Sequence, residues 1–205
     1  MKKIFIAGAG GHMKEQIEWL KDFIIEKNDY EIKGFLSKQK LVKNKYKLPT
    51  TLEKNLKIDK DIYIYLAIGD PFVREKIFNK FKNFNFLTMI HPSSFISSQA
   101  KIGKGCSISP QCILAGDAKI DKFNNLNSGT YISHDCNIGK NNTFSPCVKI
   151  LGGCTIGKNN FFGSNSVLIP KIKLNNENII GAGAVIINNF KSKNTIVGNP
   201  ARIKR

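Results

Sequence analysis

The sequence predicts a small α/β domain followed by a parallel β-solenoid built from six-residue repeats. Two observations carry this prediction. Residues 1–91 alternate short apolar runs with stretches of helical periodicity, which is typical of a small parallel sheet flanked by helices. From residue 96 onward an apolar residue recurs at every sixth position, a period that fits neither a helix nor a two-faced strand but is typical of a solenoid. We therefore expect two domains, 1–91 and 92–205.

The first domain is expected to be Rossmann-like, with each element indicated by its local pattern. Apolar runs predict strands over 3–7, 31–36, 62–68 and 85–90, and residues near a 3.6 period predict helices over 12–27 and 72–81. The first strand runs into Gly8-Ala9-Gly10-Gly11, which places a glycine loop at the turn into the first helix.

The six-residue register holds without insertion through the second domain. Sixteen successive positions are aliphatic or Phe: Ile96, Ile102, Ile108, Leu114, Ile120, Leu126, Ile132, Ile138, Phe144, Ile150, Ile156, Phe162, Leu168, Leu174, Ile180 and Ile186. The position four residues later is mostly small, as a narrow prism requires, and it holds Cys106, Cys112, Cys136 and Cys154. We expect these cysteines to be buried spacers and three hexads to complete each turn. The α/β domain and the tail after Phe190 should cap the two ends.

The net charge suggests a nucleic-acid-binding protein, but the composition does not support that interpretation. The chain of 205 residues has 32 Lys plus Arg against 15 Asp plus Glu, a net charge of +17. Only three of the basic residues are Arg, the side chain that reads guanine and clamps phosphate with a planar fork. Aromatic stacking platforms are also missing, so we expect no specific nucleic acid partner, and codon bias explains most of the Lys.

The apolar runs and the cysteines of the sequence bear on the cellular location of the protein and on whether it binds a metal. The apolar start breaks into glycines after seven residues, too short for a signal peptide, and no apolar run is long enough to span a membrane. We expect a cytoplasmic protein whose five Cys are reduced thiols. The odd Cys count, with no CxxC pair, argues against a zinc or redox motif.

The chain contains only three His: His12, His91 and His134. His134 follows the inward residue of its hexad by two positions, so it should face outward near a corner of the solenoid. Asp135 follows it and could orient the imidazole and stabilise its charged form. His is the usual general base near neutral pH, so this pair is the candidate catalytic group. The glycine loop could bind phosphate with its backbone amides at the helix N-terminus.

Taken in order, the motifs of this chain resemble those of one family over its whole length. They are Gly8-Ala9-Gly10-Gly11-His12, Ala67-Ile68-Gly69-Asp70, His91-Pro92, His134-Asp135-Cys136, Leu151-Gly152-Gly153 and Val197-Gly198-Asn199-Pro200-Ala201. The sequence is similar to the two-domain hexapeptide acetyltransferases of bacterial surface sugars, PglD-like or NeuD-like. The resemblance implies a left-handed β-helix, a homotrimer, acetyl-CoA as co-substrate in a groove between two solenoids, and a sugar pocket in the N-terminal domain.

The resemblance also implies roles for individual residues. His134 and Asp135 would be the base and its acidic partner. Substrate-binding positions would be Gly8, Ala9, Gly10, Gly11, His12, Ser37, Lys38, Ala67, Gly69, Asp70 and Arg74. Cofactor-binding positions would be Thr143, Gly152, Ser164 and Ala182, with Lys158, Lys171 and Lys173 as partners for the coenzyme A phosphates.

The sequence departs from the family pattern at three places. UDP-sugar binders of the family usually carry a pair of Asp where this chain has Ser37 and Lys38. Many relatives have an acidic residue where Ser133 stands, and a second His where Thr143 stands. Thr can donate a hydrogen bond but cannot act as a second base.

The expected reaction is N-acetylation of a nucleotide-linked, UDP-type 4-amino-4,6-dideoxy sugar for surface glycan biosynthesis. The first alternative is O-acetylation of sialic acid or a related nonulosonic acid. The second is a structural solenoid subunit without catalytic activity. A γ-type carbonic anhydrase would need three His converging on zinc, and only His134 lies in the solenoid.

Overall fold

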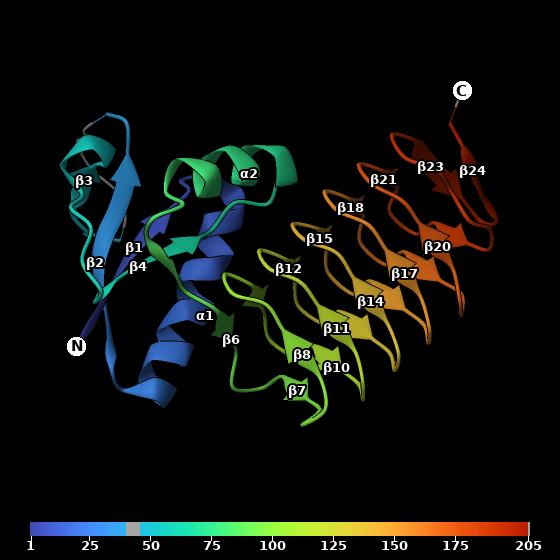
Figure 1. Ribbon diagram of the computed structural model, residues 1–205, viewed down its shortest axis with the longest axis horizontal. Helices are drawn as coiled ribbons and strands as arrows, with labels where there is room; N and C mark the ends of the chain where they lie inside the picture. Colours follow the sequence, from blue (N-terminus) through green and yellow to red (C-terminus); the bar gives the residue numbers. More distant parts are fainter. Residues whose placement is uncertain (40–45, 205) are drawn as a thin grey trace.

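The computed structural model describes residues 1–39 and 46–204 as an α/β domain docked against a β-solenoid (Figure 1). The N-terminal domain contains β1 (Lys2–Ala7), α1 (Gly11–Lys27), β2 (Tyr30–Ser37), β3 (Thr50–Leu52), a 3₁₀ turn (Glu53–Asn55), β4 (Ile62–Leu66), α2 (Pro71–Lys80) and β5 (Asn85–Phe86). Its parallel sheet has the order β3-β2-β1-β4-β5. Both predicted helices are present, and β3 is a strand that the apolar pattern did not predict.

The two helices cover opposite faces of this sheet. Met13 and Ile17 of α1 pack with Ile6 of β1, whereas Phe78 of α2 packs with Ile64 of β4. After β1 the chain adds β2 and β3 on one side of that strand and then β4 and β5 on the other, so the strand order reverses at β1. The loops after β1 and β4 therefore lie side by side at the carboxyl edge, where ligands of open α/β sheets bind.

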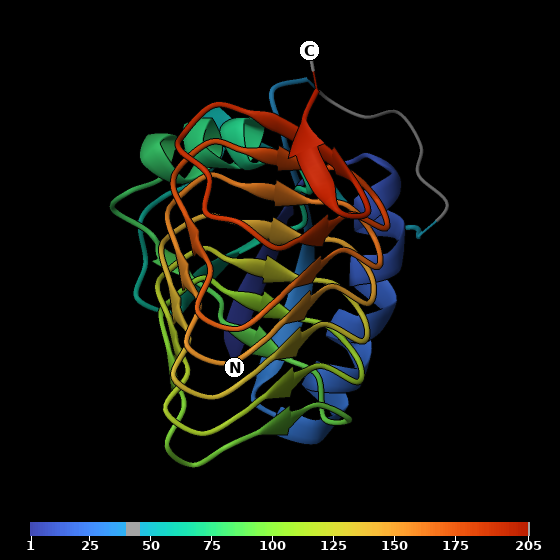
Figure 2. The same ribbon diagram turned by 90° about the vertical axis from the view of Figure 1, so that its right-hand side faces the viewer.

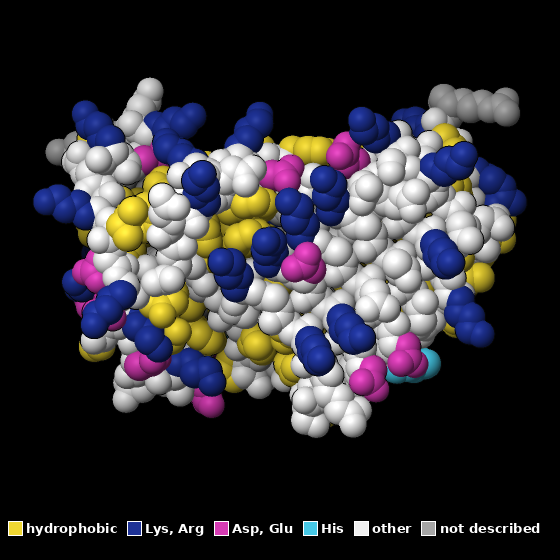
Figure 3. All heavy atoms as spheres, in the orientation of Figure 1, with side chains coloured by type: hydrophobic (Ala, Val, Ile, Leu, Met, Phe, Trp, Pro, Cys, Tyr) yellow, Lys and Arg dark blue, Asp and Glu magenta, His cyan; other side chains and the backbone are white. Residues whose placement is uncertain are grey.

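The solenoid has three faces, each a sheet of mostly two-residue parallel strands. The first, here called the docked face, comprises β6 (Met89–Ile90), β9 (Ser107–Ile108), β12 (Asn125–Leu126), β15 (Thr143–Phe144), β18 (Phe161–Phe162), β21 (Ile179–Ile180) and β23 (Thr195–Gly198), followed by the antiparallel β24 (Ala201–Ile203). The N-terminal domain lies against this face, and Figure 3 shows Lys and Arg side chains gathered near the junction.

The other two faces are named here by their outward side chains. The apolar face comprises β7 (Phe95–Ile96), β10 (Ile113–Leu114), β13 (Tyr131–Ile132), β16 (Lys149–Ile150), β19 (Val167–Leu168) and β22 (Val185–Ile186). The polar face comprises β8 (Lys101–Ile102), β11 (Lys119–Ile120), β14 (Asn137–Ile138), β17 (Thr155–Ile156) and β20 (Lys173–Leu174). Figure 2 shows the three sides of the coil from its end.

The six-residue pattern maps directly onto this prism. Strands of successive turns pair three hexads apart, as Leu114 does with Ile132 and Ile132 with Ile150, so three hexads make one turn as predicted. The second residue of each strand points inward, and the four cysteines predicted as spacers are buried. One backbone position in each hexad from Gly105 to Gly183 has a positive φ, which turns the chain at each corner.

The two ends of the solenoid differ from what the six-residue pattern predicts. The run 85–90 is split between β5 of the N-terminal sheet and β6, which pairs with β9 and already belongs to the docked face. At the other end, the tail does more than cover the coil, because β23 pairs with β21 and extends the same face.

Asparagines inside the coil form a hydrogen-bonded ladder. Asn142, Asn160 and Asn178 each donate their backbone N–H to the side-chain oxygen of the Asn one turn earlier, at 2.8 Å. The sequence pattern predicts only small spacers at these positions. Their recurrence at every third hexad is the signal that indicates the ladder.

Candidate functional site

The candidate catalytic pair lies at the corner between the apolar and polar faces. His134 Nδ1 is 2.8 Å from Asp135 Oδ2, and both side chains are exposed, at 67% and 66%. Asp135 has a φ of 59°, a left-handed conformation that Asp tolerates better than most residues. Because Nδ1 is engaged by the carboxylate, Nε2 is the ring nitrogen left to accept a proton.

Gly152 supports the imidazole from the next turn of the same corner. A Cβ added to Gly152 would stand 2.6 Å from both Cε1 and Nε2 of His134. The ring therefore lies directly on the Gly152 backbone, and any larger residue would displace it. This contact places two residues predicted for different roles, base and cofactor binding, in one local structure.

The predicted substrate loops meet at the carboxyl edge of the N-terminal sheet. Gly8 has a φ of 129°, and a Cβ there would collide with the carbonyl oxygen of Ala67. At Gly10 and Gly11 an added Cβ would meet nothing within 4 Å, so their backbone is open. Gly10 is the N-cap of α1, and the first turn of that helix contains no acidic residue. This open helix start can accept an anionic group.

The other predicted loop residues surround the same edge. Ala9 is exposed in the glycine loop. Ser37 ends β2, where its hydroxyl accepts a hydrogen bond from the Gln39 backbone at 3.2 Å, and Lys38 is exposed beside it. Asp70 caps α2, its Oδ1 accepting from the Val73 backbone at 2.8 Å. Its carboxylate is therefore already used in holding the helix start.

His12 joins this pocket to the docked face of the solenoid. Its Nε2 is 2.9 Å from Nδ2 of Asn125 on β12, and its ring lies 3.5 Å from a Cβ position on Gly69. Burial lowers the pKa of His12, with Glu15 opposing and Arg74 reinforcing the shift. Asn125 Oδ1 is buried and has no partner among the described residues. Asn125 could not be found from the sequence, because nothing in the local pattern links it to residue 12.

Arg74 and Thr143 lie between the two domains. Arg74 is buried and donates to Asn141 Oδ1, Thr143 Oγ1 and several backbone carbonyls, including Asn142 O at 3.0 Å. Burial lowers its pKa to about 10. Thr143 Oγ1 in turn donates to Gly69 O at 2.6 Å. In this chain both side chains therefore link the N-terminal domain to the solenoid, although the resemblance implies a ligand for each.

The remaining predicted cofactor residues lie at different places on the prism. Lys171 follows Gly152 along the His134 corner, whereas Ser164 and Ala182 lie at the corner between the docked and apolar faces. Lys158 lies at the third corner, and Lys173 lies on the polar face. One subunit thus does not bring these residues together.

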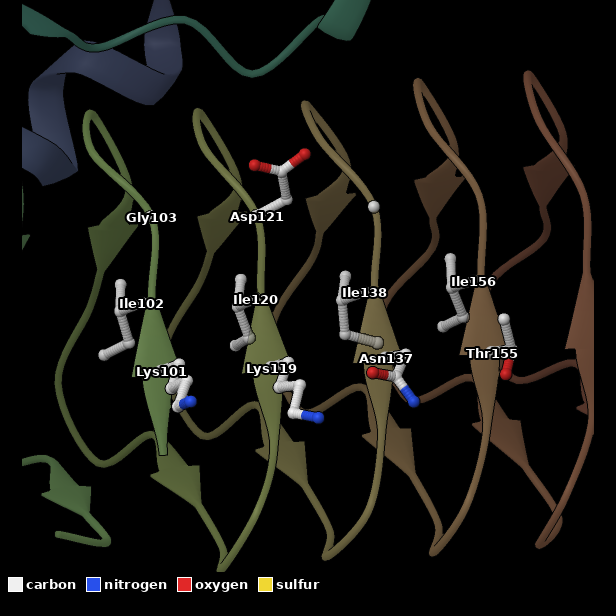
Figure 4. A pocket seen from close by; sticks show the side chains of 11 residues that line it. Lys101, Ile102, Gly103, Lys119, Ile120, Asp121, Asn137, Ile138, Thr155 and Ile156 are labelled. Carbon is white, nitrogen blue, oxygen red and sulfur yellow. The ribbon is translucent and has the colours of Figure 1, made fainter. Parts of the chain in front are cut away.

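A broad hollow on the polar face lies apart from all of these residues. It has a volume of about 520 Å³ and extends between Lys101 and Thr155 (Figure 4). None of the predicted site residues lines it. Within residues 1–39 and 46–204, no three His, Cys, Asp or Glu side chains converge as metal ligands would. Nor does this described part of the chain contain a helix with the length and apolar character needed to cross a bilayer.

Comparisons with known proteins agree with this architecture. Residues 3–81 match the model of the PglD N-terminal domain, and residues 153–188 match that of the bacterial transferase hexapeptide, six repeats. A search of curated proteins gave no match.

Solved structures match over nearly the whole chain. PerB from Caulobacter crescentus, solved with CoA and GDP-perosamine, is 25% identical with a TM-score of 0.85, over 99% of this chain and 97% of that one. The acetyltransferase domain of PglB from Neisseria gonorrhoeae is 23% identical with a TM-score of 0.89, over 100% of both chains. WeeI from Acinetobacter baumannii is 22% identical with a TM-score of 0.71, over 98% and 99%.

The fold and these matches define a left-handed β-helix transferase of the hexapeptide-repeat class. Within that class, the chain carries a PglD-type N-terminal domain over residues 3–81 and is similar to the two-domain, PglD-like sugar acetyltransferases.

Proposed function

We propose that this protein transfers the acetyl group of acetyl-CoA to the amino group of a nucleotide-linked amino sugar, with His134 as general base. The observation that carries the proposal is the His134–Asp135 pair, in which Nδ1 lies 2.8 Å from the Asp135 carboxylate. The imidazole lies on the backbone of Gly152, and its Nε2 is left to accept a proton. PerB, 25% identical, was solved with CoA and GDP-perosamine, and the PglB acetyltransferase domain was solved with acetyl coenzyme A, which supports the choice of both substrates.

In the proposed reaction, His134 Nε2 accepts a proton as the sugar amine attacks the thioester carbonyl. Asp135 holds the ring through Nδ1 and stabilises the imidazolium that forms. The same proton then passes from Nε2 to the departing thiolate of coenzyme A, which returns the imidazole to its starting state. A new C–N bond replaces the C–S bond, and no other reactant is required.

The proposed substrate pocket is the carboxyl edge of the N-terminal sheet. Its open backbone at Gly10 and Gly11 would receive the phosphates of the nucleotide, with His12 and Gly69 near the sugar. Ser37 would lie at the nucleotide end, since β2 is the neighbour of β1.

The positions of these groups favour a site built from two subunits. Asn125 lies on the docked face, where His12 of α1 contacts it, whereas His134 lies at the corner opposite that face. A single chain therefore holds the base and the pocket on opposite sides of the prism. A neighbouring subunit can bring another His134 to this pocket.

The apolar face is the surface through which we propose that three copies assemble. Its outward residues are Phe95, Ile113, Tyr131, Lys149, Val167 and Val185, and Phe95 is 64% exposed. The matching positions on the polar face are Lys, Asn or Thr (Figure 4). Apart from Lys149 this row is apolar, with Phe95 and Ile113 exposed and Tyr131, Val167 and Val185 half-buried, and a row of this kind marks an interaction surface. Packing these faces around a threefold axis would set the His134 corner of one subunit beside Ser164 and Ala182 of the next.

A coenzyme A release assay with a panel of acceptors tests the proposal. The panel contains UDP-, dTDP- and GDP-linked 4-amino-4,6-dideoxy sugars, together with free and CMP-activated nonulosonic acids. UDP-linked sugars are the first choice, and GDP-perosamine is included because PerB was solved with it. Release with an amino sugar supports the proposal. Release only with the nonulosonic acids would replace it with O-acetylation.

A further inference from the structure

A row of lysines runs along the corner between the polar and docked faces. Lys104, Lys122, Lys140 and Lys158 recur at every third hexad, so each occupies the same position in successive turns. Neighbouring strands of a sheet lie about 4.8 Å apart, which sets the separation of their backbones. The first three line a hollow of about 210 Å³, and Lys82 of the N-terminal domain completes it.

The hollow has walls from both domains and aromatic rings among its lining. Phe123, from the solenoid, stacks on Phe78 of α2 with ring centroids 4.1 Å apart. Figure 3 shows dark-blue side chains gathered where the N-terminal domain meets the solenoid. No acidic side chain is among the described residues that line the hollow.

Two carboxylates lie close to these lysines. Glu75 Oε1 is 3.6 Å from Lys140 Nζ, and Asp121 Oδ1 accepts a hydrogen bond from the Lys122 backbone at 2.7 Å. Among the described residues, Lys82, Lys104 and Lys122 form no ion pair. Like charges around one small hollow repel one another, and this repulsion opposes the docking of the two domains unless an anion offsets it.

We propose that this hollow, here called the lysine corner, binds a diphosphate, held by Lys82 on one side and Lys104, Lys122 and Lys140 on the other. Lys is a compact point charge that binds phosphate without a fixed geometry. Two linked phosphates can reach lysines on more than one turn, and the small hollow favours such an anion over a long polymer. The lysine corner and the apolar face lie on opposite edges of the docked face, so this site is separate from the surface through which the subunits are proposed to assemble.

Binding there would also connect the two domains. Lys140 precedes Asn141, whose side chain bonds Arg74 and the Pro71 carbonyl at the start of α2. Lys82 follows the end of the same helix. A diphosphate between Lys82 and Lys140 would therefore hold α2 against the solenoid at both of its ends.

The test is thermal unfolding of the full chain with about 5 mM pyrophosphate, ADP, or sodium chloride at matched ionic strength. The expected result is a rise in Tm of about 3 °C or more with pyrophosphate or ADP beyond that with the chloride. A larger rise with ADP than with pyrophosphate identifies a nucleoside diphosphate as the better ligand, and otherwise the diphosphate group alone is the ligand. A rise no greater than that with chloride would overturn the proposal.

Paired variants locate the binding. Lys104→Gln with Lys122→Gln, and separately Lys82→Gln, should remove the rise. The matched control is Lys101→Gln with Lys119→Gln, which removes the same charge from the same two turns on the polar face (Figure 4) and should keep it. A rise that survives in either of the first two proteins places the anion elsewhere, such as the glycine loop, and also overturns the proposal. None of these readouts depends on acetyl transfer.

Discussion

The imidazole of His134 rests on the backbone of Gly152, one turn further along the solenoid, with no room for a side chain between them. The contact explains why glycine is needed at position 152, because any side chain there would collide with the imidazole of the candidate base His134. It also makes the orientation of the ring depend on a residue of the next turn.

Substitution of Gly152 by Ala should impair catalysis without unfolding the protein. The added Cβ would force the ring away from Asp135, and misplacement of a catalytic group by about 1 Å can cost about 100-fold in rate. We expect kcat to fall by at least about tenfold. Gly116→Ala is the matched control, because it changes the same corner one turn before His134 and its Cβ meets its nearest atom at 3.5 Å. Equal kcat values for the two variants would contradict this account.

Removal of the imidazole should abolish most of the acetyl transfer. Loss of a general base typically costs between about 10² and 10⁴ in rate, so His134→Ala should reduce kcat by that amount while acetyl-CoA still binds. Asp135→Asn should reduce kcat by a smaller factor, because the imidazole loses the carboxylate that holds it through Nδ1. His91→Gln serves as control, since His91 pairs with Asp22 of α1, away from the His134 corner. Wild-type turnover by His134→Ala would exclude His134 as the base.

A charge on the apolar face should break the assembly. Ile113 is 39% exposed on that face, and Ile113→Lys would place a charge in the proposed interface. We expect the mass measured by light scattering to fall from three chains to one, with loss of activity. Ile25→Lys, on an exposed face of α1, should remain trimeric. If Ile113→Lys keeps the mass and activity of the wild type, the interface is elsewhere.

The pKa of His12 should depend on Asn125. Burial lowers this pKa below the ordinary 6.5, so the unfolded chain protonates His12 first as the pH falls. The contribution of neutral His12 to stability is therefore complete above about pH 6.5 and is lost as the pH falls from there through the folded value. Asn125→Asp puts a carboxylate beside Nε2 and should raise the pKa.

With only three His in the chain, NMR of the labelled imidazoles can follow this titration directly. Asn83→Asp, on an exposed turn, is the control and should leave the curve unchanged. A His12 titration that is the same in Asn125→Asp and in the wild type would show that the amide does not set the state of the ring.

Much of the solenoid follows from local pattern, because each turn repeats one set of backbone angles and one inward residue per hexad. The strands, the register of three hexads per turn and the buried Cys136 could therefore be predicted, and so could the exposed corner that carries His134. β3 was not predicted, because Thr50–Leu52 is too short to show a period.

The junction between the domains could not be predicted, because its contacts join residues far apart in the chain. His12 meets Asn125 across 113 positions, and Arg74 meets Thr143 across 69. Nothing in the sequence near Arg74 distinguishes a ligand-binding guanidinium from one that donates to the solenoid. The resemblance to the family assigns Arg74 to the substrate pocket. In the structure, its guanidinium instead donates buried hydrogen bonds to the solenoid at the junction between the domains.

The measurement that tests the central claim most directly is complementation between two inactive subunits. His134→Ala lacks the base, and Gly10→Asp places a negative charge at the open helix start where phosphate is proposed to bind. Gly10→Asn, which caps the helix without the charge, should retain activity. Co-expressed under two tags and purified as mixed trimers, the two inactive variants should recover acetyl transfer, because the His134 of one subunit serves the pocket of the other. Mixed trimers as inactive as either parent would contradict a site shared between subunits.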